Sequence, residues 1–286
     1  MNTDFLIIQG NIPEAQLQDH LAEHLSSGSL VPLAPGVWQL ADWPEADFPS
    51  LAAWCASQRL DCARVPSARK LEHFGLLAMD MDSTLIAVEC IDEVADMLGL
   101  KPQVAAITQA AMRGEMAFAE SLTRRVALLT GLDANLLDRV YQERVVLNPG
   151  AERLIRRLQQ TGIKTLLVSG GFTFFTSRLK EKLGLDFAAA NELEIVNGRL
   201  TGRVLGDILG AEAKAVHLKQ TAERLGIPLS ATVAVGDGAN DLPMLGSAGI
   251  SFAFRAKPVV REKAAYAINF NGLDAILPVL GDGLEA

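Results

Sequence analysis

Two acidic residues spaced two apart follow a short apolar run, and together they could carry out covalent chemistry. Asp80 and Asp82 come directly after the apolar residues 75–79. Ligands bind at the carboxyl ends of strands in open α/β sheets, which is where this spacing places both carboxylates. One carboxylate can attack an electrophile while the other transfers a proton. The alternative is that Asp82 and Ser83 only cap the next turn.

A second acidic segment has the same relation to a second apolar run. Asp237 and Asp241 lie in Gly-Asp-Gly-Ala-Asn-Asp, directly after the apolar residues 232–235. Magnesium binds a few carboxylates together with waters and phosphate oxygens. Asp237 facing Asp80 across one sheet edge would supply such ligands, with Asp241 beside them as a further ligand or behind them. A Gly-Asp-Gly turn alone is more often a loop than a metal site.

Two further segments are suited to an anion. Ser169 and Gly170 follow a third apolar run, and a helix is predicted from about Thr173, so backbone N–H groups and the helix N-terminus could approach a phosphate. Lys214 lies early in another predicted helix, where its ammonium could hold a phosphoryl oxygen. The alternatives are a helix cap after a turn and a solvated lysine.

The elements that must position these residues alternate between apolar strands and amphipathic helices, which predicts an α/β fold with a doubly wound, mostly parallel sheet. Strands are expected at 75–79, 163–168, 232–235 and 249–253. A helical stretch from Glu89 to about Gln142 exceeds what a crossover needs, so we expect an inserted helical cap at about 87–145. Asn197-Gly198, between alternating residues over 192–203, predicts a tight hairpin.

The first 70 residues have a different pattern. Strand-like runs alternate with helical ones, and the polar stretch 67–70 reads as a linker, so residues 1–70 are expected to form a small α+β domain and residues 71–286 the core. The expected strands are 5–9, 37–41 and 62–65, and the expected helices are 13–25 and 48–58.

Composition narrows the functional classes. The chain has 286 residues, 49% of them hydrophobic, and a net charge of −8, which disfavours nucleic acid and anionic membranes as partners. Three cysteines without Cys-x-x-Cys spacing argue against a disulfide framework or a zinc knuckle. No run approaches the roughly 20 apolar residues of a membrane helix, and the start lacks the basic region of a signal peptide. We expect a cytoplasmic protein.

The four motifs, in this order, resemble those of the haloacid dehalogenase-like phosphohydrolase superfamily, whose fold is Rossmann-like. The resemblance covers residues 75–281, and the flanking residues look like bacterial phosphoserine phosphatases. It implies that Asp80 attacks phosphorus to form an aspartyl-phosphate, and that Asp82 protonates the leaving oxygen and later activates water. It also implies one Mg²⁺ per active site, held by Asp80, the Asp82 carbonyl and Asp237. The remaining implied contacts to the phosphoryl group or the water come from Ser169, Gly170, Lys214 and Asn240.

In that superfamily the cap selects the substrate, and matching residues are present here. The resemblance implies substrate contacts from Glu89, Met112, Phe118 and Arg125. An acid and a guanidinium would make charge-assisted contacts with the ammonium and carboxylate of phosphoserine. The implied activity is a phosphoric monoester hydrolase that forms serine in the last step of its biosynthesis. The residues alone would equally allow Arg124 and Arg125 on a solvated helix face.

Two rival functions follow from the same residues. A related enzyme could act on another small phosphomonoester or transfer the phosphoryl group to an alcohol. A binding protein on an inactive scaffold would lack a nucleophile, acid, lysine or metal carboxylate, and none of those positions is vacant. The resemblance further suggests an amino-acid-binding, ACT-like N-terminal domain that regulates or dimerises the enzyme, so a homodimer is one expected form.

Overall fold

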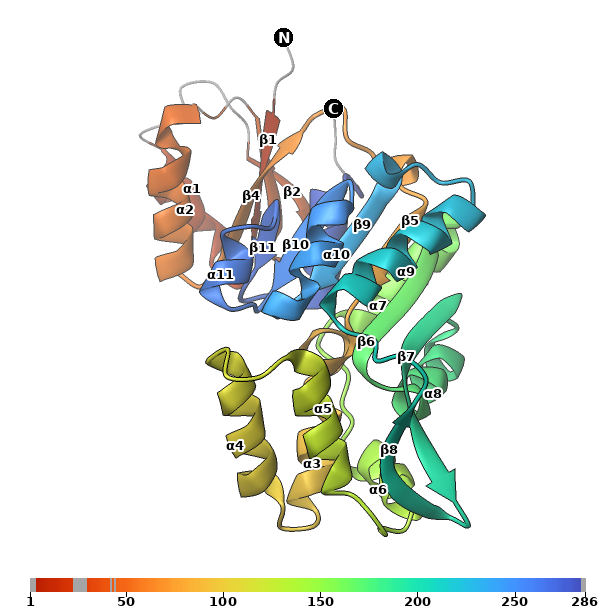
Figure 1. The fold of residues 1–286 in the computed structure, drawn as a ribbon. Coiled ribbons are helices and arrows are strands. Elements are labelled where there is room, and N and C mark those ends of the chain that lie inside the picture. Colours follow the sequence, from red (N-terminus) through yellow and green to blue (C-terminus); the bar gives the residue numbers. More distant parts are fainter. Residues whose placement is uncertain (1–3, 23–29, 42, 44, 284–286) are drawn as a thin grey trace.

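Two sheets organise the molecule. The computed structural model describes residues 4–22, 30–41, 43 and 45–283, and Figure 1 shows a small sheet next to a larger one, with a group of helices beyond the far end of the larger sheet. None of the described helices is long and apolar enough to cross a membrane.

The larger sheet has seven strands and confirms the predicted fold class. Its order is β11-β10-β9-β5-β6-β7-β8, and all neighbours are parallel except β7 and β8. The strands are β5 (Leu76–Met79), β6 (Lys164–Phe172), β7 (Phe187–Val196), β8 (Arg199–Leu205), β9 (Thr232–Gly236), β10 (Ile250–Phe254) and β11 (Tyr266–Ile268).

Helices cover both faces of this sheet, which explains why its central strands are apolar throughout. Leu76 and Ala78 of β5 pack toward α9 (Ala211–Arg224), α10 (Leu242–Ser247) and α11 (Pro258–Arg261). Leu77 and Met79 point the other way, toward α7 (Ala151–Thr161), α8 (Thr173–Leu183) and α12 (Ile276–Val279). The alternation of neighbouring residues places one hydrophobic cluster on each face.

Four helices form the predicted insertion between β5 and α7. They are α3 (Cys90–Asp96), α4 (Lys101–Met112), α5 (Phe118–Ala127) and α6 (Asn135–Glu143), at the bottom of Figure 1. The two connections to the core pair with each other, since Ala87 N donates to Val146 O at 2.8 Å and Ile86 forms a bridge with Leu147. The cap therefore joins the core through a short antiparallel link.

The predicted hairpin is present and reaches the cap. Asn197 and Gly198 both have positive φ, 52° and 74°, as a two-residue type I′ turn requires. The strands are longer than expected, because β7 starts at Phe187 and pairs in parallel with β6. On the outer edge of β8, Leu200 exchanges hydrogen bonds with Gly131 and Leu132 of the cap, at 2.8 and 2.9 Å.

The N-terminal sheet has four antiparallel strands in the order β2-β3-β1-β4. Along the chain the order is βαββαβ, with β1 (Asp4–Gln9), α1 (Glu14–Leu21), β2 (Leu30–Ala34), β3 (Val37–Leu40), α2 (Phe48–Ser57) and β4 (Asp61–Pro66). Strand β2 was not predicted, because Pro32 lies within it and Pro35 directly follows it, and proline disfavours a strand. The end of the predicted helix 13–25 lies outside the described residues.

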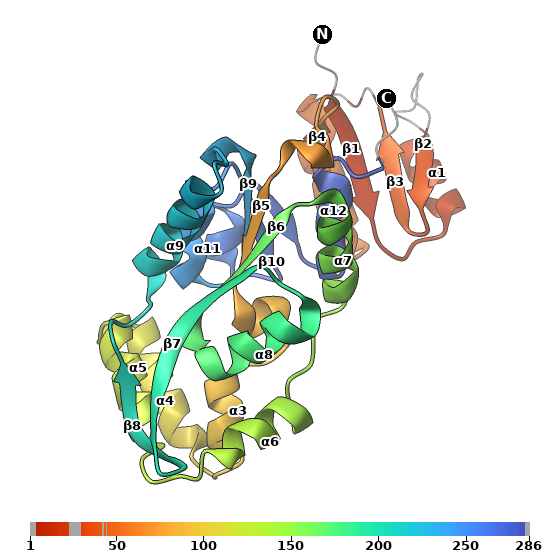
Figure 2. The ribbon, with the colours of Figure 1, turned by 90° about the vertical axis from the view of Figure 1, so that its right-hand side faces the viewer.

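This sheet is firmly docked on the core. The carboxylate of Asp61, 4% exposed, accepts hydrogen bonds from the backbone N–H groups of Asn269, Phe270 and Asn271 at 2.7 to 3.2 Å. Ile7 and Val65 belong to the same hydrophobic cluster as the core strands. Figure 2 shows α7 and α12 standing between the two sheets.

Candidate active site

Asp80 stands where β5 ends and the chain turns toward the cap. Its backbone N–H donates to Val235 O at 3.1 Å, and its Oδ1 accepts from Met81 N at 2.8 Å. The next residues form one wide helical turn, Met81–Leu85, within which Ser83 has a φ of 58°. This backbone is uncommon for a residue other than glycine and curls the chain around the Asp80 carboxylate. The residue is 5% exposed.

Asp237 and Asp241 follow the neighbouring strand β9, as the sequence predicted. Asp241 is fully buried, and its Oδ2 accepts from Asp237 N at 3.1 Å and from Gly238 N at 3.0 Å. A side chain at Gly236 would place its Cβ 2.5 Å from the Asp241 carboxyl group, so this approach requires glycine. Asp237 Oδ1 accepts from the hydroxyl of Thr84 at 3.1 Å, which links the two strand ends.

Lys214 lies one turn into α9 and joins two of these acids. Its Nζ is 2.7 Å from Asp80 Oδ1 and 2.7 Å from Asp241 Oδ1, and the residue is 1% exposed. Burial by itself would lower the pKa of Lys214, but the two carboxylates outweigh burial and raise that pKa above its ordinary value. The lysine is therefore a fixed positive charge next to the Asp80 carboxylate.

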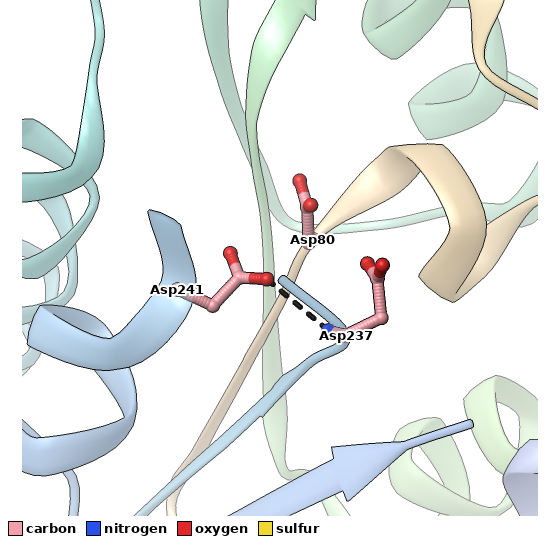
Figure 3. Close-up of side chains that lie close together, drawn as sticks. All are labelled: Asp80, Asp237 and Asp241. Atoms are coloured by element: carbon pink, nitrogen blue, oxygen red, sulfur yellow. Dashed lines mark hydrogen bonds between the residues drawn. The ribbon is translucent and has the colours of Figure 1, made fainter. Parts of the chain in front are cut away.

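The three carboxylates carry more negative charge than one lysine balances. Oxygens of Asp80, Asp237 and Asp241 lie within 4.8 Å of one another (Figure 3). Burial, and next to it the charge of Asp241, raise the pKa of Asp80 well above its usual range and that of Asp237 to about 6. Such a site suits a hard divalent cation. Both oxygens of Asp241 already accept hydrogen bonds, so Asp80 and Asp237 are better placed as ligands.

Asp82 has the environment of an acid that keeps its proton near neutrality. Burial and then the charge of Glu89 raise the pKa of Asp82 to about 7, against the opposing hydrogen bond from Cys90 N to Oδ1 at 3.0 Å. A Cβ at Gly171 would lie 2.7 Å from Asp82 Oδ2. The position after Gly170 must therefore also be glycine for Asp82 to reach this place.

Ser169 and Gly170 lie within the end of β6, which continues to Phe172 rather than ending at residue 168 as predicted. Helix α8 begins at Thr173 as expected. Ser169 Oγ accepts from Gly171 N at 2.9 Å. Asn191 Nδ2 donates to Gly170 O at 2.9 Å, and Asn191 Oδ1 accepts from Leu209 N at 2.7 Å, so this buried amide fastens the segment.

A cavity of about 470 Å³ lies between the cap and the strand ends. It brings together most of the predicted site residues: Asp80, Asp82, Glu89, Phe118, Arg125, Ser169, Gly170, Asp237 and Asn240. Lys214 and Asp241 lie outside the set of lining residues, and Lys214 connects Asp241 to Asp80. The side chain of Met112 is outside the described part of the structure.

The cap wall of this cavity carries opposite charges. Glu89 Oε1 accepts from the hydroxyl of Ser83 at 2.7 Å. Arg125 is largely buried, which lowers its guanidinium pKa, while Asp92 and Glu89 oppose that shift. A Cβ at Gly170 would lie 2.9 Å from the Phe118 ring, so the cap already contacts the core at this point.

Several residues of the site carried no sequence signal. Asn148, 5% exposed, donates from Nδ2 to Thr84 O at 2.8 Å and to Ile86 O at 3.1 Å, and so holds the turn that follows Asp80. Its partners are more than 60 residues away in the chain, so no local pattern indicates it. Other lining residues that were not predicted to act in the site are Ile91, Asp92, Thr108, Ala111, Met116, Ser121, Leu122, Phe172, Gly238, Ala239 and Lys257.

Known proteins resemble this chain over most of its length. Residues 77–246 match the family model for haloacid dehalogenase-like hydrolase. A phosphoserine phosphatase from Polaromonas sp. is 53% identical over 216 residues, which are 74% of this chain and 92% of the relative.

Two solved structures extend the likeness to the N-terminal sheet. A hydrolase of the haloacid dehalogenase family from Salmonella enterica serovar Typhi, 34% identical, has a TM-score of 0.89 over 99% of this chain and 100% of its own. A probable phosphoserine phosphatase from Vibrio cholerae, 36% identical, has a TM-score of 0.84 over 98% of this chain and 87% of its own. The chain belongs to the haloacid dehalogenase-like hydrolase family.

Proposed function

We propose that this protein is a phosphoserine phosphatase, which hydrolyses O-phospho-L-serine to L-serine and phosphate in the cytoplasm as the last step of serine biosynthesis. The observation that carries the proposal is one cavity with Asp80 and Asp82 on the core wall and Glu89 and Arg125 on the cap wall. The relative from Polaromonas sp., which bears the same name, adds support.

The first step is attack by a carboxylate oxygen of Asp80 on phosphorus, which forms the aspartyl-phosphate as the bond from phosphorus to the seryl oxygen breaks. Asp82, whose raised pKa keeps it protonated near pH 7, donates its proton to the leaving seryl oxygen. The Lys214 ammonium and donors around Ser169 and Gly170 offset the charge of the phosphoryl oxygens.

The second step reverses the role of Asp82. As a carboxylate it removes a proton from a water molecule that attacks phosphorus, and the bond between phosphorus and the Asp80 oxygen breaks to release phosphate. Asn240, which lines the same cavity, is placed to orient the phosphate or that water. Phe118 and Arg125 close the cap side of the cavity and limit the access of other water molecules.

We propose Mg²⁺ as the cation of this site. Asp80, the carbonyl oxygen of Asp82 and Asp237 would hold it, with Asp241 fixing Asp237 through the backbone N–H at 3.1 Å. When bound, the ion would neutralise the carboxylates and polarise a phosphoryl oxygen. The raised pKa values of Asp80 and Asp237 support a cation here, because burial first and then the charge of Asp241 disfavour the ionised carboxylates, a cost that a divalent cation would offset.

Substrate choice would come from the cap. Glu89 would accept hydrogen bonds from the substrate ammonium, and Arg125 would donate to its carboxylate. Met112 is proposed as an apolar contact from the resemblance alone. Residues 1–70 would form a separate ACT-like domain that regulates or dimerises the enzyme, and the βαββαβ order supports that proposal.

The test is phosphate release from a panel of phosphomonoesters with and without Mg²⁺. We expect a strong Mg²⁺-dependent preference for phosphoserine over phosphothreonine, phosphoethanolamine and sugar phosphates. Asp80→Asn should abolish turnover while leaving the fold intact. Broad activity without preference for phosphoserine, or appreciable hydrolysis by Asp80→Asn, would contradict the substrate or the covalent step respectively.

A further inference from the structure

A second cavity lies between the N-terminal sheet and the core, away from the proposed chemistry. Its volume is about 740 Å³, compared with about 470 Å³ for the catalytic cavity, and the two share no lining residue. Its walls come from residues 9–11 and 33–37 of the N-terminal sheet, from α7, and from residues 271–283. In Figure 2 this is the side on which α7 and α12 face the N-terminal sheet.

One wall of this cavity is a basic face of α7. Arg153, Arg156, Arg157 and Gln160 line it, and their spacing of three, four and seven residues places them on one side of a helix. Arg157 binds Asp282 through two nitrogens, and Arg153 binds Asp274 at 3.3 Å.

Arg156 differs from its two neighbours on the helix. It is exposed to solvent, and among the described residues no acid pairs with it. The cavity is lined by three guanidinium groups and only two carboxylates, although the net charge of the chain is −8. The excess positive charge is therefore local.

Apolar side chains form part of the remaining lining, together with the polar residues Gln9, Asn11 and Asn271. Leu33, Pro35 and Val37 lie at the turn between β2 and β3, and Leu277 and Pro278 belong to α12. A volume of this size falls within the range of small-molecule sites, which combine apolar walls with a few charged groups. A guanidinium binds the oxygens of a carboxylate or phosphate in a planar, two-point geometry.

We infer that this cavity binds a small organic anion, whose carboxylate or phosphate pairs with Arg156 and whose carbon skeleton lies on the apolar turn between β2 and β3. The ligand would contact both the N-terminal sheet and the core. Helix α7 begins three residues after Asn148, which holds the turn following Asp80, and it leads into β6, which carries Ser169. A bound ligand would therefore affect both ends of α7, the helix that connects the turn after Asp80 with the strand that carries Ser169.

The test uses the full chain and anilinonaphthalene sulfonate, a fluorescent anion with an apolar ring system. Saturable binding is expected for the wild type, and Arg156→Gln should weaken it about tenfold, the effect of losing one charge-assisted hydrogen bond. Arg139→Gln, an equal charge change at an exposed position on the cap helix α6, should leave binding unchanged. Both variants should keep wild-type turnover.

Displacement of the dye then distinguishes the two chemical sources of the anion. Glutarate displaces it if carboxylates are the ligands, and glycerol phosphate displaces it if phosphates are; both results support the site. Absence of saturable dye binding, or equal affinities of the wild type and Arg156→Gln, would overturn the inference. Because dye binding needs no turnover, this result is independent of the proposed phosphatase reaction.

Discussion

Replacing Asn148 by alanine should destabilise the protein and slow the reaction together. The amide Nδ2 lies 2.8 Å from Thr84 O and 3.1 Å from Ile86 O, and the residue is 5% exposed. Asn148→Ala removes these two hydrogen bonds and a longer one to Ser83 O at 3.4 Å, and it leaves two buried carbonyl groups without this donor, each costing about 1–3 kcal/mol. We expect the free energy of unfolding to fall by about 2–4 kcal/mol.

The kinetic effect follows from what the turn carries. Thr84 donates to Asp237 at 3.1 Å, and Asp82 lies two residues before it, so a loosened turn misplaces both carboxylates. Because a misplacement of about 1 Å can cost about a hundredfold in rate, we expect kcat for phosphoserine to fall about ten- to hundredfold, with KM changed much less.

Urea unfolding followed by circular dichroism, and initial rates of phosphate release, measure the two effects. Asn148→Asp keeps the size of the side chain but replaces the donating Nδ2 with an oxygen that cannot donate to either carbonyl oxygen. The Asn148→Asp protein should therefore be no more stable and no more active than Asn148→Ala. Asn135→Ala, at an exposed position in the cap, should stay within about 0.5 kcal/mol of the wild type. An Asn148→Ala protein with wild-type stability and kcat would refute the reasoning.

Three further predictions address charges in the site. Arg125→Ala should raise KM for phosphoserine at least about tenfold more than KM for an aryl phosphate, since the lost contact is to the substrate carboxylate; equal increases would remove Arg125 from that role. Lys214→Met should cost about 3–5 kcal/mol in urea unfolding at pH 8, because it leaves the buried Asp80 and Asp241 carboxylates without their cation, and less at pH 5, because Asp80, whose pKa burial already raises, can then take up a proton. Burial raises the folded-state pKa of Asp237 from 3.8 to about 6. In the metal-free protein the preference of the folded state for the protonated Asp237 therefore stabilises the fold fully below about pH 4, and this stabilisation is lost as the pH rises to about 6. Because asparagine does not titrate, the melting temperature of Asp237→Asn minus that of the wild type should rise between about pH 4 and pH 6. A difference that stays constant with pH would contradict the raised pKa of Asp237.

The core and its strand-end acids could be predicted because their signals are local. Asp80 and Asp237 each follow an apolar run directly, and parallel strands bring such ends to one edge. The turn at Asn197 and Gly198 could also be predicted, because its two central residues must adopt positive φ, which Asn and Gly do readily.

What could not be predicted depends on distant partners. Asn148 and Asn191 look like ordinary polar residues until the carbonyl groups they bind are placed beside them. Strand β11 has only three residues, and it exists because β10 offers it a parallel edge. The extension of β6 to Phe172 has the same cause, because β7 pairs with it as far as Asn191.

The hydrogen bonds between β8 and the cap have a consequence for how substrate enters. Leu200 binds Gly131 and Leu132 across the outer edge of the hairpin, so a cap that swings away must break this pairing or carry the hairpin with it. If the pairing breaks, the amide protons of Gly131 and Leu200 exchange with solvent deuterium through that opening, whereas a hairpin that moves with the cap keeps both amides protected. Hydrogen exchange at these two amides would therefore distinguish the two ways of opening access to Asp80, in the resting protein and without any turnover.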